Sequence, residues 1–262
     1  MDTITDLVTT RTVIASVGLE FNIQEIFEKV PINKTLDAYS CKIITCYYQN
    51  RYRGENIFSK KKKNQSFRNA VNVIFQIENK TLNFKVSTNG NFQITGCKYY
   101  HHVIECTKYF LQLLKQYCPE TVSIWNQNIS IGLRTVMTNI VFNMGFCIDR
   151  KKLNSVLQKE KDFYNLFETN FGYTGMNIKL PLENEDYIVS LPKINWNENT
   201  WENDNETKNL MTDKQKYNTF LVFHSGKIIM SGMCEKNMYK HFEYFHNFLE
   251  KNKSKIEETI KK

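Results

Sequence analysis

The chain of 262 residues is poor in Gly and Pro, with only 10 and 4 of them. This scarcity excludes a fibrous repeat and a low-complexity linker. No run of about eighteen uncharged apolar residues is present, so no membrane-spanning helix is expected. The N-terminal residues MDTITDLVTT lack the basic and apolar regions of a secretory signal, which favours an intracellular protein. The hydrophobic fraction of 41% is nevertheless sufficient for a packed core.

The chain also lacks the local motifs of common enzymes. It has no Walker loop, no G-x-G-x-x-G, no H-E-x-x-H and no G-x-S-x-G. Its seven Cys form no C-x-x-C pair, which is typical of reduced thiols. His241 and His246 stand five residues apart and so do not share a helix face, and His101 and His102 lie between two scattered cysteines. We therefore expect no catalysis, no cofactor, no metal and no small-molecule substrate.

The net charge of +8 favours an acidic partner such as nucleic acid. The charge is uneven, because residues 182–214 form an acidic, Asn-rich stretch while both remaining parts of the chain are basic. Residues 50–66 contain Lys60 to Lys63 and are typical of an exposed basic loop. The acidic stretch is expected to be a long, partly disordered insertion between strands.

An internal repeat indicates the fold class. NFKVSTNGNFQITG (83–96) and NTFLVFHSGKIIMSG (218–232) each predict two strands joined by a tight turn, followed by an amphipathic helix. The segments 11–30 and 134–157 each predict a strand and then a helix, with Asn22 and Asp149 as the N-caps. We expect an α+β fold of two pseudo-repeated halves, with a mostly antiparallel sheet covered on one face by helices.

The two halves are expected to meet near Pro119. Residues 1–119 then form the first repeat, with the basic loop at about 50–66. Residues 120–262 form the second repeat, with the acidic insertion at about 182–214.

The strand 219–223, Thr-Phe-Leu-Val-Phe, allows two interpretations. Its apolar residues alternate, so Phe220 and Val222 face one way while Leu221 and Phe223 face the other. The strand is either buried on both faces, with the acidic insertion as one cover, or it presents Leu221 and Phe223 on an apolar face made for a ligand.

Three segments of the second half resemble the second repeat of the TATA-box-binding protein family. They are RTVMTNIVFNMGFCID (134–149), YTGMNIKL (173–180) and FLVFHSGKIIMSG (220–232). Residues 11–20 and 83–98 resemble the first repeat more weakly. The insertions are similar to those of divergent versions carried by large DNA viruses. The resemblance implies a curved, saddle-shaped sheet that binds the minor groove of A·T-rich double-stranded DNA, where inserted Phe residues kink the duplex.

The resemblance also implies roles for individual residues of the second repeat. Phe223 and Tyr173 match the pair of wedges, and Asn139 matches a central Asn that bonds minor-groove acceptors. Val141, Leu221 and Ile229 match apolar groove contacts. Ser231 matches a Thr of the family and keeps its hydroxyl group. Lys179 and Lys227 match basic positions that are placed to reach phosphates.

In the first repeat the matching positions are mostly polar. Ser87 matches a wedge position, Ala70 is the nearest match to its partner, and Thr12 replaces the central Asn. The remaining matches to DNA-contacting positions are Lys85, Gln93 and Thr95. This half is therefore expected to add polar and electrostatic contact. DNA bending is expected to be weaker or more one-sided, or to depend on a partner.

The function implied is that of a general transcription initiation factor in the nucleus, at a viral replication site or in the virion. Its implied partners are a TFIIB-like factor and the RNA polymerase machinery. The alternative is a protein-interaction or assembly module that keeps the fold without sequence-selective DNA binding. The missing wedges of the first repeat motivate that alternative.

Overall fold

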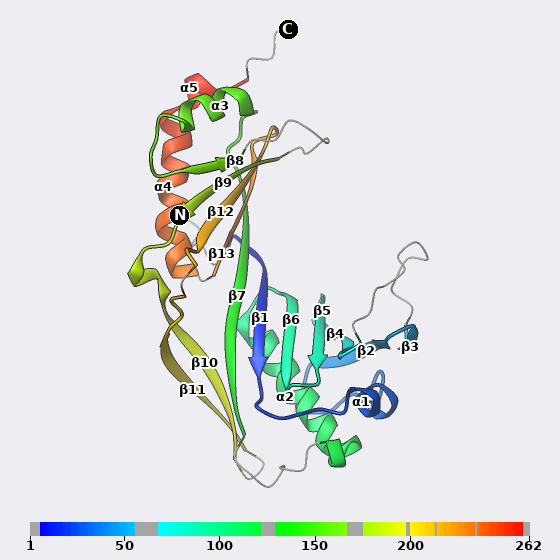
Figure 1. The fold of residues 1–262 in the computed structure, drawn as a ribbon. Coiled ribbons are helices and arrows are strands. Elements are labelled where there is room, and N and C mark those ends of the chain that lie inside the picture. Colours follow the sequence, from blue (N-terminus) through cyan, green and yellow to red (C-terminus); the bar gives the residue numbers. More distant parts are fainter. Residues whose placement is uncertain are drawn as a thin grey trace. The chain divides into compact units, whose positions relative to one another are not determined.

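The computed structural model describes residues 6–55, 68–121, 129–166, 175–197, 200–212, 214–233 and 235–258. The chain forms two compact units, shown in Figure 1. Unit 1 comprises Met1–Thr10, Val136–Val189 and Lys208–Lys262, and unit 2 comprises Arg11–Thr135 and Ser190–Thr207. Each unit therefore contains residues from both of the expected halves, and the boundary near Pro119 stays a prediction.

Unit 2 contains an open antiparallel sheet in the strand order β3-β2-β4-β5-β6-β1. Its elements in chain order are β1 (Val8–Ser16), which begins in unit 1, α1 (Ile23–Lys29), β2 (Cys41–Tyr48), β3 (Arg51–Gly54), β4 (Ala70–Ile77), β5 (Lys80–Ser87), β6 (Asn91–Cys97), α2 (Tyr100–Tyr117) and a 3₁₀ turn (Pro119–Thr121).

The core of unit 2 forms because alternate residues of its strands are apolar. Phe75, Phe84 and Phe92, from β4, β5 and β6, are fully buried. Their rings contact Phe110 of α2, with centroid distances of 5.5–6.4 Å. The expected N-cap of α1 is confirmed, because the Asn22 side chain accepts a hydrogen bond from the backbone N–H of Glu25.

Unit 1 contains a second antiparallel sheet, in the order β7-β13-β12-β9-β8. Its elements are β7 (Ile129–Asn143), which begins in unit 2, α3 (Arg150–Leu157), β8 (Tyr164–Leu166), β9 (Gly175–Pro181), a 3₁₀ turn (Asn184–Tyr187), β12 (Tyr217–Phe223), β13 (Lys227–Gly232), α4 (Glu235–Lys251) and α5 (Lys253–Ile256).

The core of unit 1 lies between its sheet and helix α4. Phe220 of β12 and Phe245 of α4 are both fully buried, and their ring centroids are 4.3 Å apart. The predicted cap of α3 is confirmed as well, because the Asp149 carboxylate accepts from the backbone N–H groups of Lys151 and Lys152.

Most of the described part of the acidic stretch forms two strands, where a partly disordered insertion was expected. β10 (Ile188–Asn197) and β11 (Thr200–Asn209) pair with each other, and β10 pairs antiparallel with β7 between Ile129 and Gly132. Pairing with an existing strand satisfies backbone groups that a polar segment would otherwise leave to water. The side chains of Trp196 and Trp201 and the loop residues Lys60 to Lys63 lie outside the described part of the structure.

The described helices include none that is both long and apolar enough to cross a membrane.

A buried polar contact connects helix α4 to β12. Asn218, on the core side of β12, donates to the backbone carbonyl of Asn237 at 3.2 Å and contacts Nδ1 of His241 at 2.9 Å. His241 is 7% exposed, and burial lowers the pKa of its imidazole below the ordinary value of 6.5. The folded state therefore favours the neutral ring, whose Nδ1 accepts the hydrogen bond from the Asn218 amide.

This contact makes stability depend on pH. The unfolded chain protonates His241 near pH 6.5 while the folded chain resists protonation, so the free energy of unfolding should fall as pH decreases from about 7 to 5.5. In His241→Gln the decrease should be smaller. Urea unfolding at both pH values measures it, and an unchanged pH dependence in the variant would contradict the assignment.

Candidate nucleic-acid interface

The sheet of unit 1 has two chemically different faces. The buried face carries only apolar residues along its central rows and packs against the helices. The opposite face, here called the open face of unit 1, is half-buried. It consists of Asn139, Val141, Asn177, Lys179, Thr219, Leu221, Phe223, Ile229 and Ser231. The interpretation that the strand 219–223 is buried on both sides is therefore wrong, because β12 alternates regularly between buried and half-buried residues.

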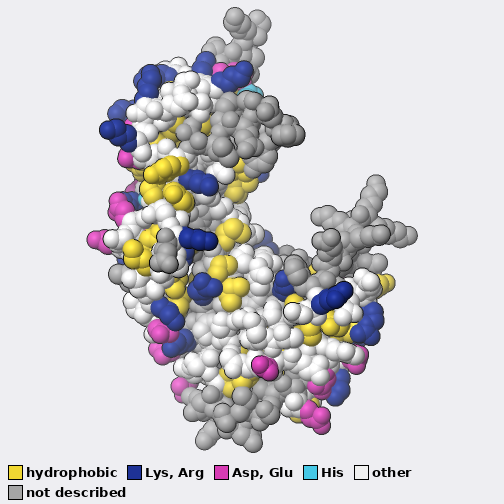
Figure 2. Space-filling view, viewed as in Figure 1, with side chains coloured by type: hydrophobic (Ala, Val, Ile, Leu, Met, Phe, Trp, Pro, Cys, Tyr) yellow, Lys and Arg dark blue, Asp and Glu magenta, His cyan; other side chains and the backbone are white. Residues whose placement is uncertain are grey.

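Strand register arranges this open face in two rows across the sheet. One row runs through Lys179, Thr219, Ser231 and Asn139, and the other through Asn177, Leu221, Ile229 and Val141. Three neighbouring apolar side chains thus lie directly beside a polar row. On the side of the molecule seen in Figure 2, apolar and Lys or Arg side chains lie next to one another over the strands of unit 1.

The polar row holds the Asn139 amide in a defined orientation. Its Oδ1 accepts from Ser231 Oγ at 2.7 Å, and its Nδ2 donates to Thr10 Oγ1 at 3.2 Å. Thr9 Oγ1 donates to the Asn139 backbone carbonyl at 3.1 Å. An Asn Nδ2 carries two hydrogens, and the bond to Thr10 uses one of them. A pre-oriented amide of this kind suits an acceptor on a base edge.

The apolar row is shaped by a glycine. A Cβ built on Gly175 would lie 2.5 Å from Cδ1 of Leu221, so the Leu221 side chain occupies the space above that glycine. Asn177 lies beside Leu221 in the same row, and its Oδ1 is buried without a hydrogen-bond partner among the described residues. This oxygen is an unused acceptor within an otherwise apolar row.

Phe223 lies at the end of β12, immediately before the turn to β13. Gly226 in that turn has φ +78, and a Cβ there would lie 2.2 Å from the Phe146 carbonyl oxygen, so the turn needs glycine. Phe223 is half-buried and Lys227 is exposed. Tyr173, the expected partner of Phe223, lies outside the described residues.

Two tyrosines of this face were missed in the sequence. Tyr164 of β8 pairs with Lys179 of β9, and its ring lies 5.7 Å from that of Tyr217. The Lys179 ammonium lies 5.8 Å from the Tyr217 ring centroid. Tyr217 continues the odd-numbered positions of β12, so alternation could have revealed it. Tyr164 is positioned by strand pairing between distant segments, which gives no local signal.

The corresponding face of unit 2 is more polar. Its register places Thr12 beside Thr95 and Asn83, and Gln93 beside Lys85 and Ile14. Of the sequence-predicted positions that the structure describes, Thr12 and Ala70 are buried, at 8% and 2% exposure. Lys85, Ser87 and Thr95 are half-buried, and Gln93 is exposed.

Register also changes the comparison of wedge positions. Ala70 pairs with Ser87, just as Gly175 pairs with Phe223. Ala70 therefore corresponds to Gly175, and the residue that matches Tyr173 is Arg68, two positions earlier. The match of Ala70 to Tyr173 is therefore wrong by two residues, because strand register, which local sequence does not show, decides the correspondence.

Comparisons with known proteins find similarity both in sequence and in structure. No protein-family model matches the chain. The chain is 28% identical over 225 residues to the uncharacterized protein 335L of Invertebrate iridescent virus 6, covering 76% of this chain and 67% of that protein. TBP of Methanococcus jannaschii matches the structure with a TM-score of 0.52, covering 93% of this chain and 97% of the other at 10% identity.

The chain has a TBP-like fold. At 10% identity this likeness concerns the arrangement of helices and strands alone. The chain also has a viral relative. The sequence predicted a mostly antiparallel sheet with helices. The structure is a mostly antiparallel open sheet with a few helices, which is consistent with a TBP-like fold.

Substitutions on the two faces of β12 are expected to differ in their effect on the free energy of unfolding. Phe220→Ala should destabilise the protein by about 3–5 kcal/mol, because it leaves a cavity beside Phe245. Leu221→Ala should cost only about 1 kcal/mol, because this side chain is half-exposed. Chemical unfolding of both variants measures the difference, and equal losses would show that both faces are core.

Proposed function

We propose that the protein is a TBP-like transcription initiation factor that binds A·T-rich double-stranded DNA in the minor groove. The observation that carries this proposal is the open face of unit 1. There Leu221, Ile229 and Val141 form an apolar row beside the oriented amide of Asn139. An apolar row next to hydrogen-bond donors is chemically complementary to a minor groove that displays only acceptors at A·T pairs.

Phe223 is the proposed wedge. An inserted aromatic ring unstacks one base step at a cost of a few kcal/mol, and the bent duplex offsets this cost by contacting more protein surface. Steps such as TA deform most easily, so the preference for A·T-rich sites would arise largely from deformability. Lys227, exposed at the same end of the sheet, would reach a phosphate.

The sheets of both units would contact DNA. In this proposal the polar face of unit 2 contributes phosphate and base-edge contacts through Lys85 and Gln93. Because Ser87 stands where unit 1 has Phe223, this face lacks the aromatic wedge at that position. The proposed bending is therefore stronger at the end bound by unit 1.

The remaining roles are proposed from the resemblance to the TATA-box-binding protein family. The protein would act without catalysis or cofactor and would recruit a TFIIB-like factor and the RNA polymerase machinery. The viral relative supports a site of action where viral genes are transcribed, in the nucleus, at a replication site or in the virion.

The polar face of unit 2 favours one alternative. A TBP-like module that has lost one wedge could serve as a protein-interaction or assembly module without sequence-selective DNA binding. The two functions differ at Phe223, which the alternative does not require for DNA bending.

The test is a bending assay with short duplexes labelled at both ends, one with an A·T-rich core containing TA steps and one with a G·C core. At fixed salt, the protein should raise end-to-end energy transfer only with the A·T-rich duplex. Phe223→Ala should reduce this signal to the level of the G·C duplex and weaken binding about tenfold, since stacking on one base is worth about 1–3 kcal/mol.

Tyr239→Ala is the matched control, because Tyr239 is an exposed aromatic residue of α4 and lies outside the open face. It should bend DNA as the unmodified protein does. Equal binding to both duplexes without a change in energy transfer would contradict the initiation-factor proposal and favour the assembly module.

A further inference from the structure

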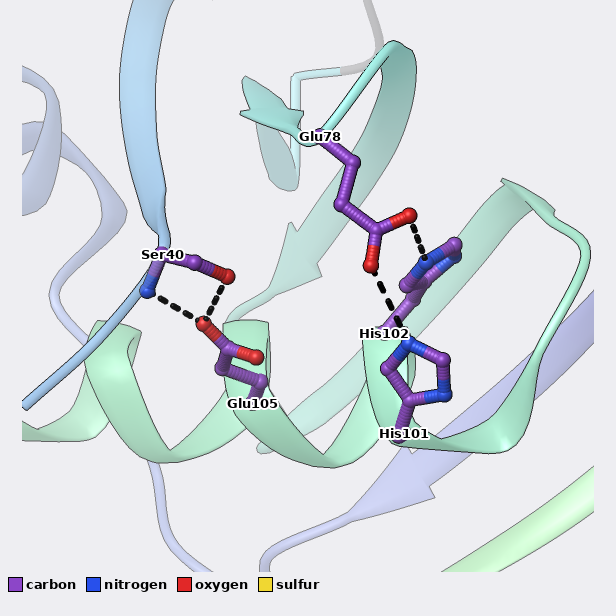
Figure 3. A network of polar contacts seen from close by, with 5 residues as sticks. All are labelled: Ser40, Glu78, His101, His102 and Glu105. Carbon is purple, nitrogen blue, oxygen red and sulfur yellow. Dashed lines mark hydrogen bonds and ion pairs between the residues drawn. The ribbon is translucent and has the colours of Figure 1, made fainter.

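A cluster of two histidines and one glutamate in unit 2 is unused by the proposed DNA-binding face. Glu78 lies in the tight turn between β4 and β5, and His101 and His102 lie in the first turn of α2. One ligand atom from each of the three residues lies within 4.8 Å of the others. Figure 3 shows the Glu78 carboxylate extending from its turn toward both imidazole rings.

The distances within this cluster suit a tetrahedral metal. His101 Nε2 lies 3.4 Å from Glu78 Oε1, and His102 Nε2 lies 3.3 Å from Glu78 Oε2. Bonds of about 2.0–2.1 Å at tetrahedral angles separate two ligand atoms by about 3.4 Å. Each imidazole Nε2 therefore already lies at a suitable distance from one oxygen of the Glu78 carboxylate, and one ligand atom from each histidine lies within 4.8 Å of the other.

The cluster combines one buried side chain with two exposed ones. His102 is 1% exposed in its side chain, whereas His101 and Glu78 are 58% and 54% exposed. A pocket of about 280 Å³ opens beside Glu78 and is also lined by Gln76 and Ser40. Water can reach the cluster from the side of the exposed His101 and Glu78.

The neighbouring carboxylate of Glu105 already accepts hydrogen bonds from Ser40 and is not proposed as a ligand. Glu105, one turn further along α2, accepts hydrogen bonds from both the backbone N–H and the hydroxyl of Ser40 (Figure 3). This pair connects the segment before β2 to α2. Glu78 makes the second connection, from the β4–β5 turn to the same helix.

We propose that Glu78, His101 and His102 bind a divalent transition-metal ion of the Zn²⁺ class, with water as the fourth ligand. Two imidazole nitrogens favour such an ion over Mg²⁺ or Ca²⁺, which prefer oxygen ligands. The ion connects the β4–β5 turn to the first turn of α2. His102 Nδ1 is buried without a hydrogen-bond partner among the described residues, so outer-shell support is weak and the expected affinity is micromolar.

Cysteine ligation is a separate possibility that the test must distinguish. The described cysteines are free, and most are buried. Burial raises the pKa of the Cys46 thiol to about 12 and that of Cys97 to about 11, which disfavours the thiolate form that metals require.

The experiment is a titration of the full chain with Zn²⁺ by calorimetry and with Co²⁺ by visible absorption. One equivalent should bind, with the d–d bands of a tetrahedral ion and without a thiolate charge-transfer band. Glu78→Gln and His101→Ala change exposed residues, so both variants should remain folded, and each should weaken binding about 100-fold or more. Metal should raise the melting temperature of the unmodified protein but not that of Glu78→Gln or His101→Ala.

The matched control is His224→Ala, because His224 also contacts a single carboxylate, that of Glu258, at an exposed position. It should bind metal like the unmodified protein. The proposal is overturned if His224→Ala weakens binding as much as His101→Ala. It is also overturned if a charge-transfer band shows thiolate ligation, or if no equivalent binds at micromolar concentration.

Discussion

The packing of one face of each sheet against helices is the constraint on which the rest of the structure depends. Side chains alternate along a strand, so burying Phe220 against Phe245 places Leu221 on the opposite face. A register slip of one residue would exchange the two faces completely. The composition of the open face is therefore determined by the same contact that stabilises the core.

Asn side chains serve opposite purposes on the two faces of unit 1. On the buried face Asn218 is stabilised by His241 and a carbonyl of α4, and so positions the helix on the sheet. On the open face Asn139 is held by Ser231 and Thr10, which orient its amide. A buried polar group needs partners because its loss of water is costly, whereas a half-exposed one can keep a donor for a ligand.

Units 1 and 2 contain comparable strand orders but differ in the chemistry of their open faces. Unit 1 has an apolar row through Leu221 and has Phe223 two residues further along the same strand, while the corresponding strand of unit 2 has Lys85 and Ser87. Both patterns are compatible with the core, because only the buried face is constrained by packing. Packing therefore leaves the composition of each open face unconstrained, and function has to be argued from each face separately.

Local sequence patterns were sufficient to predict the hairpin of β12 and β13, the helices that follow both hairpins, and the caps at Asn22 and Asp149. Each of these features depends on residues only a few positions apart, so periodicity and turn chemistry determine it. The alternation of Leu221 and Phe223 was equally visible. Whether that strand is buried on both faces or leaves one face open depends on what packs against it, which the local pattern does not show.

Only the tertiary structure decided the contacts between distant segments. It paired the acidic stretch with β7 as strand β10, placed Tyr164 beside Tyr217, and brought Glu78 to His101 and His102. These contacts depend on how strands pair across the sheet and on where a helix begins relative to a distant turn. Side-chain identity along the chain therefore determined which elements form and which faces are apolar, whereas strand pairing, which no local pattern encodes, determined which side chains meet.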